Sequence, residues 1–396
     1  MYPELYIVFG SFRAPVFLQL TDPKEVKPES RCLSHRSCYH LLRGVIRWRL
    51  RCKYRHKESR SLHNANRYRT HGRLAMRPIA AIVLLTIGYV PAFSKAVWID
   101  TDPSVQKGVH EVDDGFALVQ AFRSNELAIR GISVVFGNSP LAEAYPIGQD
   151  LVKRYGPPKM PVYRGAAGAA ELGIETPASR ALADALKKER LTILVLGPAT
   201  NVATVVKNHP ELTKQIEEVI AVAGRRPGQK FRPSDDVRSF RDFNFELDAP
   251  AFQVLLDSRV KVVLAPWEIS SKVWLTSDDL DSLVKADPSL SFVVDAARDW
   301  LAFWKKDLHT VGFNPFDTLA VGYAISPAGF QCEQFAGFIR TLPDDTHTGA
   351  GAAPRKPYLL VEKPAPQAQM VTYCSDAGPG FKASLLGRLR KGTSPN

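Results

Sequence analysis

Hydrophobic positions along the chain alternate between short unbroken apolar runs and longer amphipathic stretches. Short apolar runs bounded by turn residues are typical of buried strands, and apolar residues that recur with the helical period are typical of helices. The predicted strands cover residues 97–102, 129–136, 160–163, 192–196, 218–223 and 260–264. The predicted helices cover residues 112–122, 141–155, 177–189, 278–308 with a break at Pro288, and 315–325, and a further helix is capped at Thr200 or Asn201.

This alternation predicts a parallel sheet, because each helix returns the chain to the edge at which the next strand begins. After residue 331 the pattern changes to strands at 335–340, 358–361 and 369–373, with a Gly/Ala/Pro-rich loop at 347–357. We therefore expect an α/β fold with a mostly parallel, doubly wound open sheet and a small antiparallel β extension at the C-terminal end. No repeat or linker divides residues 97–396, so we expect one domain there.

The first predicted strand ends in Asp100 and Asp102, and Asp113 and Asp114 begin the helix that follows it. Parallel sheets hold ligands at the C-terminal ends of their strands, and the first turn of a helix favours negative charge. These four carboxylates are therefore expected to converge. Four anions cannot share a small volume without a cation, so the pattern predicts a divalent-metal or catalytic site. The alternative is that Asp113 only caps a helix and that Asp100 is a solvated loop residue.

The positive charge of the chain is concentrated in residues 1–75, which hold 16 Lys/Arg against 5 Asp/Glu and so account for +11 of the net +12. A basic arm that binds nucleic acid is one interpretation. We favour a disordered or non-native leader, because a positive, apolar and small-residue pattern begins at Met76 and is typical of a signal peptide. We expect residues 76–96 to be that signal peptide. The mature protein would then start near Val97, be periplasmic or secreted, and bind neither membrane nor nucleic acid.

Cysteine usage adds little to this picture. Cys32, Cys38 and Cys52 match no zinc motif. Cys332 and Cys374 are compatible with a disulfide or with two buried thiols, and the sequence leaves both open.

Five motifs follow one another in a single order along residues 97–325. They are Asp100-Thr101-Asp102-Pro103 with Asp113-Asp114-Gly115-Phe116-Ala117-Leu118; Phe136-Gly137-Asn138; Leu196-Gly197-Pro198-Ala199-Thr200-Asn201-Val202-Ala203; residues 242–251 (DFNFELDAPA); and Phe316-Asp317-Thr318-Leu319-Ala320. Together they resemble the inosine–uridine preferring nucleoside hydrolase family. The resemblance implies that family's fold, a small-molecule nucleoside substrate, hydrolysis of the N-glycosidic bond to ribose and a free nucleobase, and Ca²⁺ as cofactor. It leaves a homo-oligomer open.

The resemblance also implies a role for each matching residue. The calcium ligands would be Asp102, Asp114, the main-chain carbonyl of Thr200, and Asp317. Asp102 would also be the general base on a metal-bound water. Ribose contacts would come from Asp113, Asn138, Asn244, Asp242 in place of a family Glu, and Asp236 in place of a family Asn. Asp100 would order the loop from behind.

Two departures bear on catalysis. Nine residues, 104–112, separate Pro103 from Asp113 where the family has two. Phe316 replaces a histidine that donates a proton to the leaving base in purine-accepting members. His110 and His309 are candidate substitutes, although we expect each to be a surface or hydrogen-bonded histidine. We expect four tryptophans, Trp267, Trp274, Trp300 and Trp304, to pack in the core rather than stack on a base.

Three other functions remain alternatives. One is a catalytically impaired protein of the same fold that binds nucleosides or ribose, suggested by Phe316 and the inserted loop. Another is a haloacid dehalogenase-type phosphatase, because the D-T-D-P-S segment at residues 100–104 resembles its nucleophile motif. The third is nucleic-acid binding through residues 1–75. We predict Ca²⁺-dependent hydrolysis of ribonucleosides.

Overall fold

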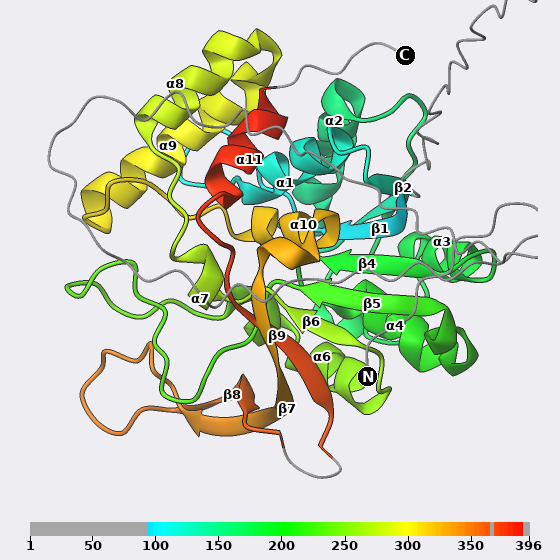
Figure 1. The fold of residues 1–396 in the computed structure, drawn as a ribbon. Coiled ribbons are helices and arrows are strands. Elements are labelled where there is room, and N and C mark those ends of the chain that lie inside the picture. Colours follow the sequence, from blue (N-terminus) through cyan, green and yellow to red (C-terminus); the bar gives the residue numbers. More distant parts are fainter. Residues whose placement is uncertain (1–93, 365–367, 391–396) are drawn as a thin grey trace, which may run out of the picture. The chain divides into compact units, whose positions relative to one another are not determined.

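The computed structural model describes residues 94–364 and 368–390 (Figure 1). The basic segment at 1–75 and most of the expected signal peptide lie outside the described residues. The first strand, β1 (Lys95–Thr101), begins two residues before the expected mature start near Val97. Lys95 pairs there with Glu218 at 3.3 Å.

The described residues form one nine-stranded sheet, in the order β3-β2-β1-β4-β5-β6-β9-β7-β8. The other strands are β2 (Leu127–Val134), β3 (Val162–Arg164), β4 (Leu191–Val195), β5 (Ile216–Ala221), β6 (Val262–Leu264), β7 (Gln331–Pro343), β8 (Arg355–Glu362) and β9 (Met370–Asp376). Strands β1 to β6 are mutually parallel, and β9 continues them by pairing parallel to β6. Only β7 runs antiparallel, to both β8 and β9. The expected fold class is thus confirmed, and its C-terminal extension is continuous with the main sheet.

Helices cover both faces of the sheet (Figure 1). They are α1 (Asp113–Phe122), α2 (Leu141–Tyr155), α3 (Pro177–Leu186), α4 (Thr200–Asn208), α5 (Phe243–Leu247), α6 (Ala249–Asp257), α7 (Trp267–Ser270), α8 (Ser277–Ala286), α9 (Ser291–Asp307), α10 (Phe316–Ile325) and α11 (Phe381–Leu389). Short 3-10 turns lie at Ala169–Glu171, Pro210–Gln215, Pro288–Leu290 and Pro327–Gly329. None of the helices in the described part of the chain is long and apolar enough to cross a membrane.

Two hydrophobic cores, one on each face, explain why the central strands read as unbroken apolar runs. Neighbouring strand residues point to opposite faces, so Ile99 joins the core beneath α1, α9 and α10, whereas Trp98 joins the core beneath α3, α4 and α6. Likewise, Leu194 of β4 joins the first of these cores and Ile193 joins the second. Helix α10 is apolar on all sides because nearly all of it is buried.

The predicted elements match the structure to within a few residues at most ends. The helix at 141–155 is confirmed at both ends, and the break at Pro288 is a 3-10 turn between α8 and α9. Sequence patterns missed α5, α6, α7 and α11. Cys332 and Cys374 face each other on β7 and β9 and form a disulfide, one of the two possibilities left open.

Candidate active site

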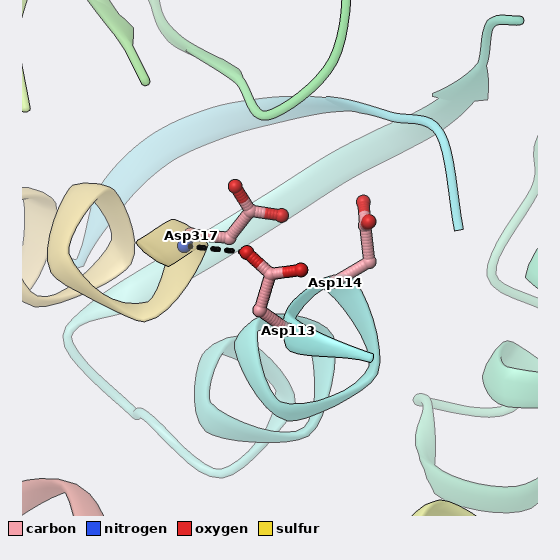
Figure 2. Close-up of side chains that lie close together, drawn as sticks. All are labelled: Asp113, Asp114 and Asp317. Carbon is pink, nitrogen blue, oxygen red and sulfur yellow. Dashed lines mark hydrogen bonds between the residues drawn. The ribbon is translucent and has the colours of Figure 1, made fainter. Parts of the chain in front are cut away.

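Three aspartates converge where the first turns of α1 and α10 meet (Figure 2). Asp113 and Asp114 begin α1, and Asp317 lies in the first turn of α10. One carboxylate oxygen from each lies within 4.8 Å of the other two, and all three residues are buried. The backbone N–H of Asp317 donates to Asp113 Oδ2 at 3.2 Å, which fixes the start of α10 against the start of α1. Residues 204 positions apart are therefore joined at one point.

Asp102 follows β1 and is enclosed by two glycines from later motifs. A Cβ on Gly137 would lie 1.8 Å from Asp102 Oδ2, and one on Gly197 would lie 2.7 Å from Oδ1. The backbone N–H of Asn138 donates to Asp102 Oδ2 at 2.8 Å. The second oxygen, Oδ1, is buried without a hydrogen-bond partner among the described residues. Glycine at both positions is therefore required by the close approach of Asp102.

Asp114 and Asp100 are held by hydrogen bonds on different sides of the strand end. Asp114 accepts from the Thr101 hydroxyl and from the backbone N–H of Asp102 at 3.2 Å. Asp100 Oδ1 accepts from Ser133 Oγ at 2.5 Å and from Asn201 Nδ2 at 2.8 Å, so it ties β1 to β2 and α4. The role implied for Asp100, ordering the loop from behind, stays a prediction.

The buried carboxyls destabilise one another's ionised form. Burial raises the pKa of Asp102, Asp113 and Asp317 well above its usual value, and repulsion between neighbouring carboxylates raises it further. Burial raises the pKa of Asp114 to about 6, although its hydrogen bonds oppose the shift. Burial raises that of Asp100 to about 7. Without a cation the cluster therefore binds protons more readily than isolated carboxyls do.

The donor set fits a hard divalent cation. Oxygen atoms make up the whole cluster, and Asp102 Oδ1 and Asp113 Oδ1 are buried without hydrogen-bond partners in the described part of the chain. Carboxylate oxygens are the ligands that Ca²⁺ prefers, whereas zinc sites usually include nitrogen or sulfur. A cation held by the three aspartates would offset the repulsion between their carboxylates.

A cavity of about 500 Å³ opens beside this cluster. Its polar lining includes Asp113, Asn138, Asp242, Asn244 and Asp317, five of the residues predicted from sequence. The remaining lining is dominated by aromatic side chains from α7, α9, α10 and the loop before α5. The cavity thus joins an acidic end to an aromatic end.

Asp242 and Asn244 reach the cavity from the start of α5. Asp242 Oδ2 accepts from the backbone N–H of Gly224 at 2.8 Å, and burial raises its pKa to about 6 despite the charge of Arg225. Asn244 Nδ2 donates to the carbonyls of Leu196 at 2.7 Å and Val222 at 3.2 Å. These bonds attach the segment to the ends of β4 and β5, which explains its position at the sheet edge.

The structure does not bring Asp236, a predicted ribose contact, to the cavity. Asp236 lies on the surface, where it pairs with His309 at 2.5 Å and accepts from Ser234 Oγ at 2.7 Å. These contacts lower its pKa to about 2. Thr200, the predicted carbonyl ligand, is the buried first residue of α4, and its hydroxyl donates to Asp248 at 2.5 Å.

The inserted segment at 104–112 contributes to the cavity through Glu111, a residue that the sequence analysis did not single out. Glu111 lines it, and burial together with the charge of Asp114 raises the Glu111 pKa to about 8. Val109 lines it too, although 58% exposed. The backbone N–H of Gly108 donates to Asp299 of α9 at 2.8 Å and so ties the segment to that helix. The sequence feature that could have identified Glu111 is its position two residues before Asp113.

The structure differs from the prediction that all four tryptophans pack only in the core. Trp267, Trp300 and Trp304 line the cavity, whereas Trp274 does not. Trp304 is 1% exposed and Trp267 9%, so both also pack in the core. The core interpretation was therefore incomplete, because a side chain can be buried and still form the wall of an internal cavity.

Neither candidate histidine lines the cavity. His110 Nδ1 lies 3.3 Å from both Ser104 Oγ and Gln106 Nε2, and His309 pairs with Asp236 as described above. Both are hydrogen-bonded histidines, as expected.

Comparison with known proteins places this geometry in a family. Residues 97–375 match the model of the inosine-uridine preferring nucleoside hydrolases. Probable uridine nucleosidase 1 from Oryza sativa subsp. japonica is 25% identical over 236 residues, covering 52% of this chain and 69% of that protein. Pyrimidine-specific ribonucleoside hydrolase RihA from Salmonella paratyphi B is 24% identical over 261 residues, covering 59% and 80%.

Solved structures show the same fold. A plant nucleoside hydrolase, PpNRh1, superimposes with a TM-score of 0.61 at 20% identity, over 76% of this chain and 99% of that one. A purine-preferring ribonucleoside hydrolase from Gardnerella vaginalis gives a TM-score of 0.59 at 19% identity, over 75% and 98%. The family match covers the strand-end aspartates, both enclosing glycines and Asp317. The chain therefore belongs to the inosine-uridine preferring nucleoside hydrolases, metal-dependent enzymes that hydrolyse the N-glycosidic bond of ribonucleosides.

Proposed function

We propose that this protein is a Ca²⁺-dependent ribonucleoside hydrolase in which Asp102 is the general base. The observation that carries the proposal is the all-oxygen cluster of Asp113, Asp114 and Asp317 beside a cavity. Asp113 Oδ1 and, next to the cluster, Asp102 Oδ1 are buried without hydrogen-bond partners among the described residues. Asp102, Asp114, Asp317 and the carbonyl of Thr200 would hold the ion. Bound Ca²⁺ would supply positive charge that offsets the carboxylates and lowers the pKa of a nearby water.

The chain's own residues can then divide the remaining work. Asp102 takes a proton from the attacking water through Oδ1, the oxygen that Asn138 and the enclosing glycines leave unbonded. Asp113, Asn138, Asn244 and Asp242 hold the ribose hydroxyls. Because the ribosyl group develops positive charge as the C–N bond breaks, carboxylates fixed beside it stabilise the transition state. The aromatic end of the cavity receives the base and excludes water.

Ribose release tests this proposal. Purified protein is incubated with a panel of purine and pyrimidine nucleosides, with and without a chelator, and Asp102→Asn serves as the catalytic control. Chelator-sensitive ribose release that Asp102→Asn loses is the expected result. Absence of both Ca²⁺ binding by calorimetry and ribose release from every nucleoside would exclude the proposal.

The alternative is a nucleoside- or ribose-binding protein without turnover. Phe316 and the segment at 104–112 favour it, because both alter the cavity. Tight nucleoside binding with no ribose release would support this alternative.

We further propose that the protein is exported, with residues 76–96 as the signal peptide. Support comes from the Cys332–Cys374 disulfide, because structural disulfides persist in oxidising compartments. Cleavage after Ala96 would leave Val97 to Thr101 paired with β2 and β4. Mass spectrometry of the N-terminus after cell fractionation tests this, and an uncleaved cytoplasmic protein would refute it. A homo-oligomer remains a prediction that light scattering can check.

A further inference from the structure

Arg225 is a buried arginine in the loop that follows β5, outside the acidic cluster. It is 2% exposed, and its Nε and Nη2 atoms have no hydrogen-bond partner among the described residues. Its backbone is bonded to β8, because its N–H donates to the carbonyl of Leu359 at 3.0 Å and its carbonyl accepts from the N–H of Val361 at 3.1 Å. A buried guanidinium with unused donors lowers the stability of a fold. Stability alone therefore does not explain this arginine.

The side chain of Arg225 contacts three segments that are distant in sequence. Its Nη1 donates to Asp345 Oδ2 at 2.8 Å, in the loop between β7 and β8. Its Nη2 lies 3.8 Å from Glu246 Oε1 of α5. Its guanidinium carbon lies 3.8 Å from the centroid of the Phe231 ring, in the loop that follows β5. One guanidinium thus joins the β7–β8 loop, α5 and the loop after β5.

Each of these three segments supplies part of the cavity lining. The lining residues are Thr346 from the β7–β8 loop, Asp242 from the start of α5, and Phe231 from the loop after β5. Thr346 directly follows Asp345, the residue that Arg225 binds. The turn at residues 344–346 is also closed by Asp344, whose carboxylate accepts from the backbone N–H of Thr346 at 2.9 Å. Arg225 therefore lies behind the part of the cavity wall that these segments form.

Asp242, a predicted ribose contact, is held by the same neighbours. Its carboxylate accepts from the backbone N–H of Gly224 at 2.8 Å, and its own backbone N–H donates to Glu246 Oε1 at 3.0 Å. Arg225 follows Gly224 in the chain and pairs with Glu246, so it supports both contacts. Burial raises the pKa of Asp242 to about 6, the charges of Arg225 and Lys356 oppose the shift, and that of Glu246 adds to it. Arg225 thus favours the ionised carboxylate.

We propose that Arg225 is a positioning residue for substrate binding, which fixes the Asp242 carboxylate and the turn at 344–346 in the cavity wall. This inference rests on the hydrolase function proposed above, in which Asp242 holds a ribose hydroxyl. Arg225 does not line the cavity and so acts through these neighbours. An ionised carboxylate accepts a stronger hydrogen bond from a hydroxyl than a neutral group does. Loss of the arginine should therefore weaken the recognition of one ribose hydroxyl and leave Ca²⁺ binding unchanged.

The first test asks whether recognition of one hydroxyl depends on Arg225. kcat/KM is measured for inosine and uridine and for the 2′-, 3′- and 5′-deoxy analogues of each. Asp242→Asn identifies the hydroxyl that Asp242 holds, because the analogue that lacks it is the one least affected by this substitution. A hydrogen bond to a charged group is worth roughly 10- to 100-fold. Arg225→Met should reduce the preference for the parent nucleoside over that same analogue by about tenfold, and Arg225→Lys should restore part of it.

Arg226→Met is the matched control for this test. Arg226 is the next residue and carries the same charge, but it pairs with Glu268 of α7 at 2.8 Å and lines no part of the cavity. Its substitution should leave the preference for each hydroxyl unchanged. A loss at the same hydroxyl in Arg226→Met would show that any change in this loop has the effect, and would overturn the role of Arg225.

The fold of Arg225→Met should persist. Methionine keeps an apolar chain in the buried position, and Lys356 Nζ still lies 2.9 Å from Glu246 Oε1 and 3.3 Å from Asp345 Oδ1, so both carboxylates keep a cation. Urea unfolding and Ca²⁺ calorimetry measure this directly. The loss of hydroxyl preference at unchanged Ca²⁺ affinity is what a purely structural role would not produce.

The second test approaches the same contact from the β7–β8 loop. Asp345→Asn removes the carboxylate that accepts from Arg225 Nη1 and should reduce the preference at the same hydroxyl. Substitutions that act through one contact are not additive. The double variant Arg225→Met with Asp345→Asn should therefore lose no more than the larger single loss. Additive losses would overturn the proposed link between Arg225 and the turn at 344–346.

The outcomes separate this inference from the function on which it rests. If the wild type neither cleaves nor binds any of these nucleosides, the proposed hydrolase function fails and the inference falls with it. If the wild type binds them without cleavage, the same comparison is made with dissociation constants from calorimetry. If the wild type cleaves them and Arg225→Met lowers kcat/KM equally for every analogue, or for none, only the present inference is overturned.

Discussion

Replacing Asp317 by asparagine should stabilise the metal-free protein. Its carboxylate lies within 4.8 Å of those of Asp113 and Asp114. At that distance and an effective dielectric constant of about 20, each repulsion costs roughly 3.5 kcal/mol, so two exceed 6 kcal/mol. Holding Asp317 protonated at pH 7 instead, about 3.2 pH units above the usual pKa of 3.8, costs about 4 kcal/mol. Protonation is the smaller cost, which sets an upper limit of about 4 kcal/mol on the gain.

The stabilisation of the metal-free protein by Asp317→Asn should increase as the pH rises. Because the pKa of Asp317 is raised in the folded protein, the unfolded chain releases its proton first as pH rises above 3.8. The wild type therefore loses stability from about pH 4 toward the folded pKa, and the asparagine variant does not lose this contribution. The difference should be near zero at pH 4 and grow by up to about 1.4 kcal/mol per pH unit.

Urea unfolding followed by tryptophan fluorescence measures the effect, with metal-free protein at pH 4, 5.5 and 7. Added Ca²⁺ should narrow the difference at pH 7, because the wild type gains about 2.7 kcal/mol at a hundredfold excess over Kd and the variant lacks a charged ligand. Asp236→Asn is the control, because that exposed carboxylate has a lowered pKa and its loss should give no stabilisation. A metal-free Asp317→Asn protein less stable than wild type at pH 7 would refute the electrostatic argument.

Three further perturbations test the site and the fold. Asp102→Asn should lower kcat roughly 10²- to 10⁴-fold, which is the usual contribution of a general base. Nucleoside binding, measured by calorimetry, should persist. An unchanged kcat would show that Asp102 is not the general base. Gly137→Ala should weaken both Ca²⁺ binding and turnover, since its Cβ would lie 1.8 Å from Asp102 Oδ2, whereas Gly168→Ala meets no atom within 4 Å and should change neither. Reducing the Cys332–Cys374 bond, which closes a 42-residue separation, should lower the free energy of unfolding by about 4 kcal/mol in urea titrations, and no shift would show that the bridge does not constrain the unfolded chain.

Much of the acidic site follows from sequence because its parts are local. A strand that ends in Asp102 and a helix that begins with Asp113 need only short-range patterns, and parallel strands bring such ends to one edge. The motifs around Gly137 and Gly197 supplied residues from two more strand ends. The reason for a glycine at each of these two positions became clear only in the fold, where both glycines enclose the Asp102 carboxylate.

The sequence by itself determined the order of strands and helices, the α/β class and the family's strand-end carboxylates, because each depends on neighbours a few residues away. Only the tertiary structure decided that β9 runs parallel to β6, that Cys332 bonds to Cys374, and that Asp236 faces solvent. It also brought Trp267, Trp300, Trp304 and Phe316 of α7, α9 and α10 to the cavity, together with Glu111. The lining of a cavity depends on which distant elements pack together, and a hydrophobic pattern does not distinguish a ring that faces a cavity from one that faces the core.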